Sequence, residues 1–448
     1  MSQAENKVIP EGYKQTEIGV IPEDWQVAEI VDISSKVTDG THDTPSPVRE
    51  GVPFLTAIHI KENNIAFESC YYLPKSIHDE IYRRCNPEFE DVLMVNIGAG
   101  TGTTALVTVD YPFSLKNVAL IKPNKLRTDG RYLNQVLSFQ KNNILDSLSA
   151  GGAQPFLSLS QISQIKISTP CKKEQTAIAN ALSDVDALLS ELEKLIAKKQ
   201  AMKTATMQQL LTGKNRLPQF AFYSDINSIE GAVEGKRKGT KPSELGEIPD
   251  DWEVVNLGEI ISFKNGAAHE DCVDEYGNFV LVNSKFVSTE GRVRKGASEC
   301  RQAASNNDLL MVMSDVPNGK AIAKCFLVDQ DNLYTVNQRI CILKPLDEMN
   351  PIFLLKVLSR NPYYLAFDDG AKQTNLRRQD VLSCPLVKPP KEEQTAIATI
   401  LSDMDNEIQT LEQRLSKTRQ IKQGMMQELL TGKTRLPFGK DITSEVSV

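Results

Sequence analysis

The sequence lacks the features that mark disulfide-bonded, zinc-binding and membrane-spanning proteins. Its eight cysteines are scattered over 448 residues without a C-x-x-C pair, and its four histidines do not cluster with them. This usage is typical of reduced thiols and favours neither a disulfide framework nor a zinc site. No apolar run approaches transmembrane length, and the first residues are polar rather than signal-like. We therefore expect a cytoplasmic protein without a membrane partner.

The sequence also lacks an excess of positive charge. It contains 51 lysines and arginines against 58 aspartates and glutamates, which gives a net charge of −7. Proteins that bind nucleic acids usually present a basic surface. A DNA-binding role therefore requires that the basic surface be local, or that partner subunits supply much of the phosphate contact. The length and the 40% hydrophobic content are ordinary for a globular protein of about two to four domains.

A long internal repeat organises the chain. Residues 172–218 and 391–437 align without a gap at an offset of 219, and about half of the aligned positions are identical. Such a repeat implies two copies of one unit and hence pseudo-twofold symmetry. Each copy contains L-L-T-G-K near its end, with Gly213 or Gly432 where a left-handed helix C-cap is expected.

Each copy of the repeat has the apolar spacing of a coiled coil. Apolar residues recur at steps of four and three, which predicts one long helix per copy with a seam along one face. A helix over residues 172–211 would be roughly 60 Å long at about 1.5 Å per residue, and two such antiparallel helices would form a rigid spacer. The alternative is an ordinary helical hairpin within a larger fold. The predicted seam consists of Ile178, Leu182, Val185, Leu189, Leu192, Ile196, Ile397, Leu401, Met404, Ile408, Leu411 and Leu415.

Two globular blocks, which we call the first domain (residues 24–165) and the second domain (251–385), precede the two helices. Short apolar runs broken by Gly, Asn and Asp predict strands with few helices, and weak matches between the blocks predict one shared α+β fold. A matching I-P-x-D-W segment leads into each block. Its tryptophan, Trp25 or Trp252, is expected to pack on the domain core.

The predicted fold class is α+β, with two similar domains separated by a long antiparallel two-helix coiled coil. The order is circular, because the N-terminal segment must meet the C-terminal helix to complete the second repeat unit. The predicted regions are an N-terminal segment (1–23), the first domain (24–165), a central helix region (166–218), a linker with the second I-P-x-D-W segment (219–250), the second domain (251–385), a C-terminal helix region (386–437) and a tail (438–448).

Three motifs occur twice, once in each half of the chain. They are I-P-x-D-W at Ile21–Trp25 and Ile248–Trp252, E-Q-T-A-I-A at Glu174–Ala179 and Glu393–Ala398, and L-L-T-G-K-x-R-L-P at Leu210–Pro218 and Leu429–Pro437. Through this paired arrangement the sequence resembles the specificity subunit of type I restriction–modification systems over nearly its whole length. The segment 39–45 (D-G-T-H-D-T-P) also resembles a loop in the family's first variable domain.

The resemblance implies a division of labour. Each domain would be a target recognition domain that reads one half of an asymmetric, split site on double-stranded DNA. The helices would set the gap between the half-sites and dock two methyltransferase subunits, and two restriction subunits that translocate DNA would join the complex. The resemblance also implies no active site and no cofactor in this chain, with S-adenosylmethionine, ATP and Mg²⁺ bound by the partner subunits.

The residues that contact DNA are expected on loops of the two domains. Base edges are read by polar side chains such as Arg, Lys, Asn, Gln, Ser and Thr, and the alternative for each is a solvated side chain or a phosphate contact. The candidates in the first domain are Thr38, Asp39, Thr41, His42, Asn96, Gln154 and Ser158. The candidates in the second domain are Lys264, Asn265, Asn337, Gln373, Asn375, Arg377 and Arg378.

Two fragments imitate enzyme motifs. Gly98–Gly102 is rich in glycine, but a strand-like run follows it where a dinucleotide site needs a helix, so it predicts a hairpin turn. Asn361–Tyr364 lacks the second proline of the methyltransferase N-P-P-Y motif and predicts a helix stop. We therefore predict no catalysis by this chain. Two other classes stay open: a coiled-coil adaptor that binds only protein, and a relative of fused methyltransferases with its own cofactor site.

Overall fold

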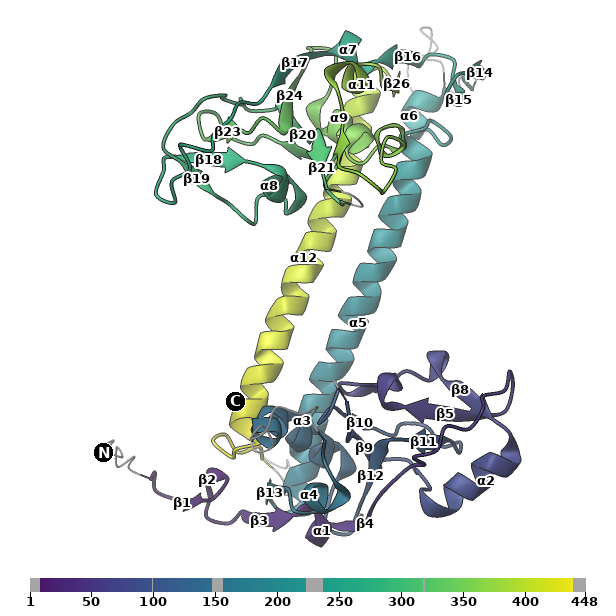
Figure 1. The fold of residues 1–448 in the computed structure, drawn as a ribbon, viewed down its shortest axis with the longest axis vertical. Helices are drawn as coiled ribbons and strands as arrows, with labels where there is room; N and C mark the ends of the chain where they lie inside the picture. The colour runs from purple at the N-terminus through teal and green to yellow at the C-terminus, as the bar shows by residue number, and fades with distance from the viewer. Residues whose placement is uncertain (1–8, 99, 147–155, 223–236, 317–318, 438–448) are drawn as a thin grey trace, which may run out of the picture. The chain divides into compact units, whose positions relative to one another are not determined.

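The computed structural model describes residues 9–98, 100–146, 156–222, 237–316 and 319–437. The chain forms two units by its internal contacts. Unit 1 contains residues up to 194 and from 413 onward, and unit 2 contains residues 195–412. Each unit combines one domain with a segment of each long helix, α5 (Lys172–Leu210) and α12 (Lys391–Leu429) (Figure 1).

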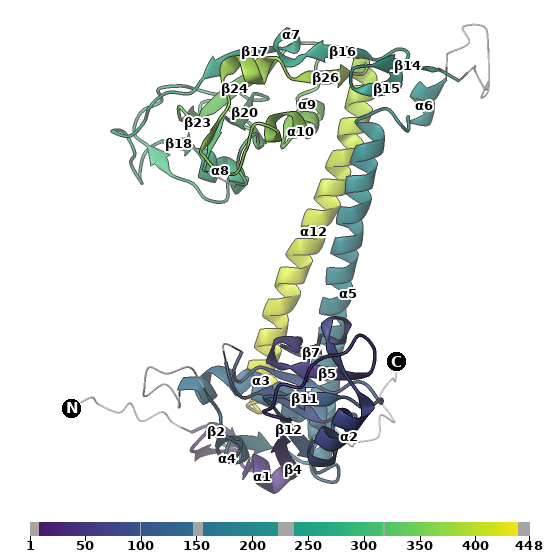
Figure 2. The same cartoon turned by 45° about the vertical axis from the view of Figure 1, so that its right-hand side comes forward.

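Both long helices have 39 residues and begin and end at equivalent positions of the repeat. Within each unit a segment of α5 lies beside a segment of α12 (Figures 1 and 2). In unit 1, Asp186 pairs with Lys422 and Glu193 pairs with Arg419, so the partner number falls as the residue number rises. This order confirms the predicted antiparallel arrangement.

The predicted seam residues occupy two kinds of environment. Those near the start of each helix lie in a domain core: Ile178 and Leu182 belong to a cluster with Trp25 and Tyr132. Further along, Leu192, Ile196 and Ile408 are buried, whereas Val185, Leu189, Met404, Leu411 and Leu415 are half-buried. In unit 2, Ile397 and Leu401 repeat the packing of Ile178 and Leu182, in a cluster with Trp252 and Phe353.

The first domain is built on an antiparallel four-stranded sheet of order β10-β9-β12-β4 and a three-stranded sheet of order β11-β5-β8. The strands of the first sheet are Thr104–Leu106, Val92–Val95, Val118–Pro123 and Ser34–Asp39, and those of the second are Ser114–Lys116, Val52–Thr56 and Tyr71–Leu73. The helices are α1 (Ile30–Ile33), α2 (Lys75–Arg84), α3 (Gly130–Asp146) and α4 (Leu159–Ser163).

The second domain has the same topology. Its sheets have the orders β17-β24-β20-β22 and β19-β18-β23. Their strands are Ile261–Asn265, Ile340–Pro345, Leu309–Val312 and Cys325–Leu327, then Gly296–Ala297, Phe279–Val282 and Tyr334–Val336. The helices are α7 (Leu257–Ile260), α8 (Ser284–Ser288), α9 (Pro351–Leu358), α10 (Pro362–Leu365) and α11 (Arg378–Leu382). The predicted shared α+β fold is thereby confirmed.

Small strand pairs connect each domain to its flanking segments. A hairpin, β1 (Tyr13–Thr16) with β2 (Gly19–Pro22) or β14 (Thr240–Ser243) with β15 (Gly246–Pro249), precedes each domain. The first strand of each domain then pairs with its last, as β3 (Gln26–Glu29) with β13 (Lys166–Thr169) and β16 (Glu253–Asn256) with β26 (Pro385–Lys388). Two short strand pairs complete the strands: β6 (Ile60–Lys61) with β7 (Asn64–Ile65), and β21 (Ser314–Asp315) with β25 (Thr374–Asn375).

The longest helix of the first domain, α3, has 17 residues, because its apolar face extends to Ile144 against the core. Residues 223–236 of the linker, the Gly152–Gln154 loop and the tail lie outside the described ranges. Among the helices that are described, none is both long enough and apolar enough to cross a bilayer.

The tryptophans and the glycine C-caps meet at the helix ends. Trp25 and Trp252 are fully buried, as predicted. Gly213 and Gly432 have φ values of +69° and +71°, which confirms the left-handed caps. A Cβ atom at Gly432 would lie 2.5 Å from Cγ of Pro22 and 3.2 Å from the Trp25 ring, so the glycine also permits close packing.

We expect Gly432→Ala to destabilise unit 1, because the new Cβ is strained at positive φ and clashes with Pro22. The loss should be about 1 kcal/mol or more. Gly424 provides the matched control, because it lies inside α12 and a Cβ there meets no other atom within 4 Å. Gly424→Ala should stabilise the helix by roughly 0.5–1 kcal/mol. Calorimetric unfolding of both variants checks the opposite signs; a neutral Gly432→Ala would contradict the proposed strain.

Candidate nucleic-acid interface

A buried glutamate at the start of α5 joins three segments that are far apart in the sequence. Glu174 is 1% exposed and accepts the indole N–H of Trp25 at 3.2 Å. The guanidinium of Arg435 donates to the same carboxylate at 2.7 Å and pairs with Asp24 at 2.9 Å. The hydrogen bond from Arg435 holds the pKa of Asp24 below its ordinary value. The first I-P-x-D-W segment, the start of α5 and the segment after α12 therefore meet at one carboxylate, which confirms the predicted circular order.

Unit 2 contains the same cluster in equivalent positions. Glu393, also 1% exposed, accepts the indole N–H of Trp252 at 2.9 Å and Nε of Arg216 at 3.0 Å. Nη1 of Arg216 donates to Asp251 at 2.8 Å. The repeated I-P-x-D-W and R-L-P motifs thus form one joint with the repeated glutamate.

The residues that follow each glutamate form hydrogen bonds to the residue just before α3 in the first domain and just before α9 in the second. Oε1 of Gln175 accepts the backbone N–H of Asp129 at 3.0 Å, and the Thr176 hydroxyl donates to the Asp129 carboxylate at 2.9 Å. In unit 2, Oε1 of Gln394 accepts the backbone N–H of Asn350 at 2.9 Å. Because α3 and α9 begin at the next residue, the E-Q-T motif attaches each domain helix to its long helix.

An aspartate three helical turns further along makes a second attachment in each unit. Asp405 of α12 accepts ion pairs from Lys203 of α5 and from Lys356 of α9. Burial raises the pKa of Asp405, but the hydrogen bonds from the two lysines outweigh burial and leave the pKa below its ordinary value. Asp186 of α5 occupies the equivalent place in unit 1, where it contacts Lys422 of α12 and Gln135 of α3. We call these two sets of residues the aspartate nodes.

The first domain brings three chain segments together beside the end of β4. Gly40 N–H donates to the Val118 carbonyl at 3.2 Å, and Leu157 N–H donates to the Asn96 carbonyl at 2.8 Å. The loop after β4 therefore lies beside the start of β12, and the segment before α4 lies beside the residue after β9; the pairing of β12 with β9 brings these segments together. We call this set of segments the reading edge.

The second domain builds the reading edge with the same backbone bonds. Gly266 N–H donates to the Ile340 carbonyl at 2.9 Å, and Leu376 N–H donates to the Met313 carbonyl at 2.8 Å. Met313 N–H also donates to the Arg339 carbonyl at 2.9 Å. One backbone framework therefore carries a different set of side chains in each domain.

The candidates in the first domain vary in exposure. Thr38 and Asp39 are 8% and 4% exposed, and the Asp39 carboxylate pairs with Arg84 and with Nε2 of His42, at 3.0 Å for the latter. His42 is exposed, and its Nδ1 lies 3.1 Å from Oδ1 of Asn117, so both ring nitrogens are held. Asp39 and Asn117 thus orient His42 at the surface.

The other candidates of the first domain lie around that loop. The Thr41 hydroxyl accepts the backbone N–H of Asp43 at 3.1 Å. Asn96 is 3% exposed, and its Oδ1 has no hydrogen-bond partner among the described residues. The Ser158 hydroxyl caps α4 by accepting Gln161 N–H at 3.2 Å. Gln154 lies outside the described residues.

The candidates of the second domain are mostly exposed. Lys264 and Asn265 end β17, and Asn337 lies beside Ala267 in an isolated bridge. Nε2 of Gln373 donates to the Ser314 hydroxyl at 2.7 Å and to Asn375 at 3.3 Å.

Two arginines follow Leu376 at the reading edge. Arg377 and Arg378 are exposed, and the Arg378 guanidinium stacks 5.3 Å from the centre of the Phe263 ring. Sequence reasoning missed Arg339 and Asn117, which occupy the same place in the two reading edges. The available signal was their position one residue before the matching strands 340–345 and 118–123.

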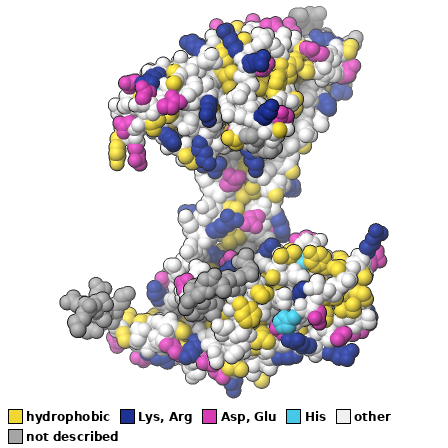
Figure 3. All heavy atoms as spheres, viewed as in Figure 1, with side chains coloured by type: hydrophobic (Ala, Val, Ile, Leu, Met, Phe, Trp, Pro, Cys, Tyr) yellow, Lys and Arg dark blue, Asp and Glu magenta, His cyan; other side chains and the backbone are white. Residues whose placement is uncertain are grey.

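An apolar pocket of about 560 Å³ adjoins the reading edge of the first domain. Its lining includes Phe54, Ile58, Tyr71 and Ile97, together with Asn117. Figure 3 shows exposed hydrophobic side chains gathered over the part of the first domain that contains β5 and β8. In the same view, lysines and arginines of the second domain are interspersed with acidic side chains, so basic surface on this face is local.

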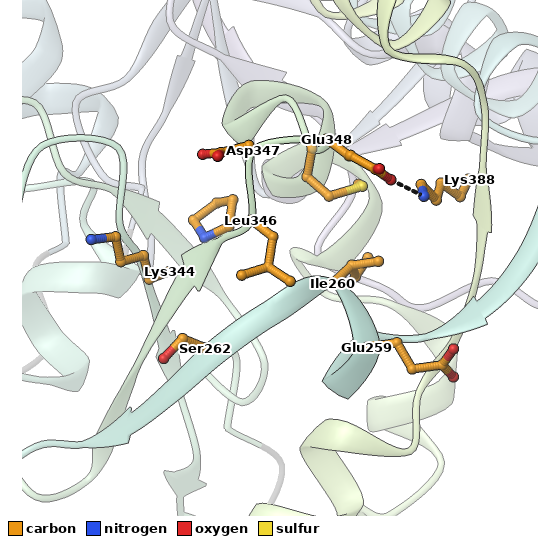
Figure 4. Close-up of a pocket in the computed structure, with 10 residues that line it drawn as sticks. Glu259, Ile260, Ser262, Lys344, Leu346, Asp347, Glu348 and Lys388 are labelled. Carbon is orange, nitrogen blue, oxygen red and sulfur yellow. Dashed lines mark hydrogen bonds and ion pairs between the residues drawn. The ribbon is translucent and has the colours of Figure 1, made fainter.

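A second pocket, of about 520 Å³, lies in the second domain between the start of β17 and the loop after β24 (Figure 4). Ile260 and Leu346 line it, and Lys388 pairs with Glu348 at 2.5 Å beside Asp347. Three carboxylates, those of Glu259, Asp347 and Glu348, outnumber the two lysines in the lining, so the pocket is poorly suited to a phosphate backbone.

The structure also shows the local environment of the two fragments that imitate enzyme motifs. The strands β9 and β10 on either side of the Gly98–Gly102 fragment are antiparallel partners, as the predicted hairpin turn requires; residue 99 lies outside the described residues. Helix α9 ends at Leu358, and Asn361 then caps the four-residue helix α10 by accepting Tyr363 N–H at 2.9 Å. Asn361–Tyr364 therefore begins a new helix, rather than forming the predicted helix stop. Within the described ranges, no group of three or more His, Cys, Asp or Glu side chains is arranged to hold a metal ion.

Comparison with known proteins identifies the family. A family model described as "Type I restriction modification DNA specificity domain" matches residues 22–203 and 249–420. The chain therefore belongs to the family of type I restriction–modification DNA specificity subunits, and it carries the family's domain twice. The motif pairs predicted this membership.

Relatives match along nearly the whole chain. The chain is 26% identical over 438 residues to a putative type I restriction enzyme MjaX specificity subunit from Methanocaldococcus jannaschii, over 95% of this chain and 97% of that protein. The S subunit of a type I restriction–modification system from M. genitalium has a similar fold, with a TM-score of 0.58, 16% identity and coverage of 91% of this chain and 96% of that one. A chain from a study of assembly and conformational transition in the type I system gives a TM-score of 0.51, 15% identity and coverage of 92% and 99%.

The aspartate node of unit 2 predicts a pH-dependent contribution to stability. A carboxyl group whose pKa is lowered by folding stabilises the protein above its unfolded pKa of about 3.9, and this contribution is lost as pH falls through the folded value. Asp405→Asn should therefore lower the free energy of unfolding at pH 7, and the difference from wild type should shrink below about pH 4. Urea unfolding at pH 7 and at pH 3 measures both. Asp403→Asn, at an exposed site two residues away, is the control; equal losses at the two pH values would contradict the ion-pair assignment.

Proposed function

We propose that this chain is a non-catalytic subunit in which each domain reads one half of a split, asymmetric DNA target. The observation that carries the proposal is the reading edge, because the same backbone bonds present different side chains in the two domains. Equal frameworks with unequal side chains are what two readers of unlike half-sites require. The family membership supports the class of activity, and the reading edge supports this proposed location for it.

The second reading edge favours guanine in its half-site. Arg339, Arg377 and Arg378 lie on segments joined through Met313, and arginine binds the O6 and N7 atoms of guanine with two hydrogen bonds. The first reading edge instead carries His42, Asn117 and the neighbouring apolar pocket. Amide side chains with apolar neighbours suit A·T pairs. Adenine forms two hydrogen bonds with an amide side chain, through its N6 and N7 atoms, and thymine presents a methyl group.

The long helices have two roles in the proposal. They act as the spacer that sets the gap between the half-sites, and their two equal copies provide two equivalent docking surfaces for two methyltransferase subunits. Two restriction subunits with translocase activity would join this assembly. S-adenosylmethionine, ATP and Mg²⁺ would bind in the partner subunits, and this chain would bind none of them.

A domain exchange tests the proposal. Residues 24–165 would be replaced by the corresponding block of another family member, and the chain would be produced with its cognate methyltransferase. Sequencing that maps methylated bases should then show a change in one half-site only. Unchanged methylation sites would contradict DNA reading and favour the protein-only adaptor; S-adenosylmethionine binding by the isolated chain would favour a fused methyltransferase.

A second prediction concerns Arg377. Arg377→Ala should weaken binding of the cognate target by about 1–3 kcal/mol and relax the preference at one base pair, because a bidentate base contact is lost. Arg377→Lys keeps the charge but cannot make two parallel hydrogen bonds to one base, so it should weaken the sequence preference at the same base pair. The test is to measure the binding affinity of each variant for targets in which each base pair is substituted in turn. If the alanine variant loses affinity equally on all sequences and the lysine variant loses none, Arg377 contacts phosphate.

A further inference from the structure

We propose that the two aspartate nodes fix the direction of each domain on the long helices and thereby determine which gap between half-sites is accepted. This inference rests on the proposed function and adds positioning residues that do not touch DNA. The nodes are Asp186 with Lys422 and Gln135, and Asp405 with Lys203 and Lys356.

The node of unit 2 joins three helices. Asp405 lies on α12, Lys203 on α5 and Lys356 in the last turn of α9. The side chains of Lys356 and Lys203 are 15% and 26% exposed, so these ion pairs are only partly screened by water. Helix α9 also packs into the domain core through Phe353 and Leu354. The node therefore connects the core of the second domain to both long helices.

A second attachment is needed because the first one lies at the helix start. Gln394 binds the backbone of Asn350, and Thr395 accepts a hydrogen bond from the Asn350 side chain at 3.2 Å. Besides the apolar cluster that Phe353 shares with Ile397 and Leu401, this polar attachment restrains α9 only at its first turn. The ion pair between Lys356 and Asp405, six residues further along α9, restrains its other end, and two separated polar contacts define a direction more firmly than one.

Unit 1 repeats the arrangement at equivalent positions. Asp186 and Asp405 lie 219 positions apart, as do Lys203 and Lys422. Nζ of Lys422 lies 2.6 Å from Asp186, and Nε2 of Gln135 donates to the same carboxylate at 2.9 Å. The recurrence of both residues outside the apolar seam shows that the node is a feature of the repeat unit.

The nodes differ in the residue that each domain supplies. The second domain supplies the charged Lys356, whereas the first supplies the neutral Gln135, which is 4% exposed and whose Oε1 has no partner among the described residues. A charge-assisted hydrogen bond is stronger than one from a neutral amide. The second domain is therefore held more firmly than the first at this point.

The experiment measures gap preference separately from base preference. The full chain would be produced with its cognate methyltransferase, and the methylated target would be mapped by sequencing. Duplexes would then carry the mapped half-sites with the native gap or with one or two base pairs added or removed. Each base pair changes the spacing by about 3.4 Å, so methylation of off-gap duplexes reports how firmly each domain is directed.

We expect Asp405→Asn to raise methylation of duplexes with one altered base pair about tenfold relative to the native gap, the size expected for loss of a partly buried ion pair. The half-site sequences should stay the same. Asp403→Asn and Asp184→Asn are matched controls, because both aspartates are exposed and lie two residues before a node aspartate. Neither control should change the gap preference.

Exchange of the domain residues covers the case in which Asp405→Asn fails to fold. Lys356→Gln gives the second node the composition of the first and should broaden gap acceptance. Gln135→Lys gives the first node the composition of the second and should narrow it. A merely stabilising role would change the melting temperature of these variants without changing the ratio of off-gap to native-gap methylation.

Two results would overturn the inference, and they are distinguishable. If the wild type methylates a split target and every node variant keeps its gap preference, the nodes do not direct the domains. If the wild type has no split target at all, the proposed function fails and this inference fails with it.

Discussion

The joint between a buried glutamate, a tryptophan and an arginine is the interaction on which the rest of the structure depends. A carboxylate that is 1% exposed is costly to bury unless its oxygens are paired, and Glu174 and Glu393 each accept both an indole N–H and a guanidinium. Removal of one partner from such a pair typically costs about 3–5 kcal/mol, because the charge is left unpaired. The joint is therefore strongly selective for one arrangement of three distant segments.

This joint explains why the chain is circular. In unit 1 the glutamate draws on residues near both chain ends, since Asp24 and Arg435 pair with each other across 411 positions. In unit 2 the equivalent residues, Arg216 and Asp251, are separated by 35 positions. The same motif therefore joins residues that are near in sequence in unit 2 and joins residues near the two chain ends in unit 1. The consequence is that two units of the same construction can be made from a single polypeptide.

The domains combine a common framework with freedom at the surface. Backbone bonds hold the loop after the edge strand, the start of a central strand and the segment before a short helix in both reading edges. Because these bonds use main-chain atoms, the side chains at Asn117 and Arg339 can differ without disturbing the sheet. If the proposed function holds, this separation between framework and surface would let one fold read two different half-sites. It would also make a net charge of −7 compatible with DNA binding, since the arginines proposed to contact DNA are few and local.

The sequence by itself determined the long helices, their pairing and the buried tryptophans. These features follow from apolar spacing and from motifs that occur twice, and both are properties of short stretches. The reading edge was predicted only in part. Thr41, His42, Ser158, Arg377 and Arg378 lie on it, whereas Asn117 and Arg339 were not among the candidates, and Thr38, Asp39 and Asn96 are buried.

Tertiary structure decided the rest. Hydrogen bonds such as Leu376 to Met313, and ion pairs such as Lys356 to Asp405, join segments that no local pattern relates. The polar partners of Glu174 and Asp186 were likewise invisible in the sequence, because a charged residue on a helix has the same local pattern whether it faces water or another chain segment. Only packing assigns its partner, since the free energy of a buried charge depends on what surrounds it.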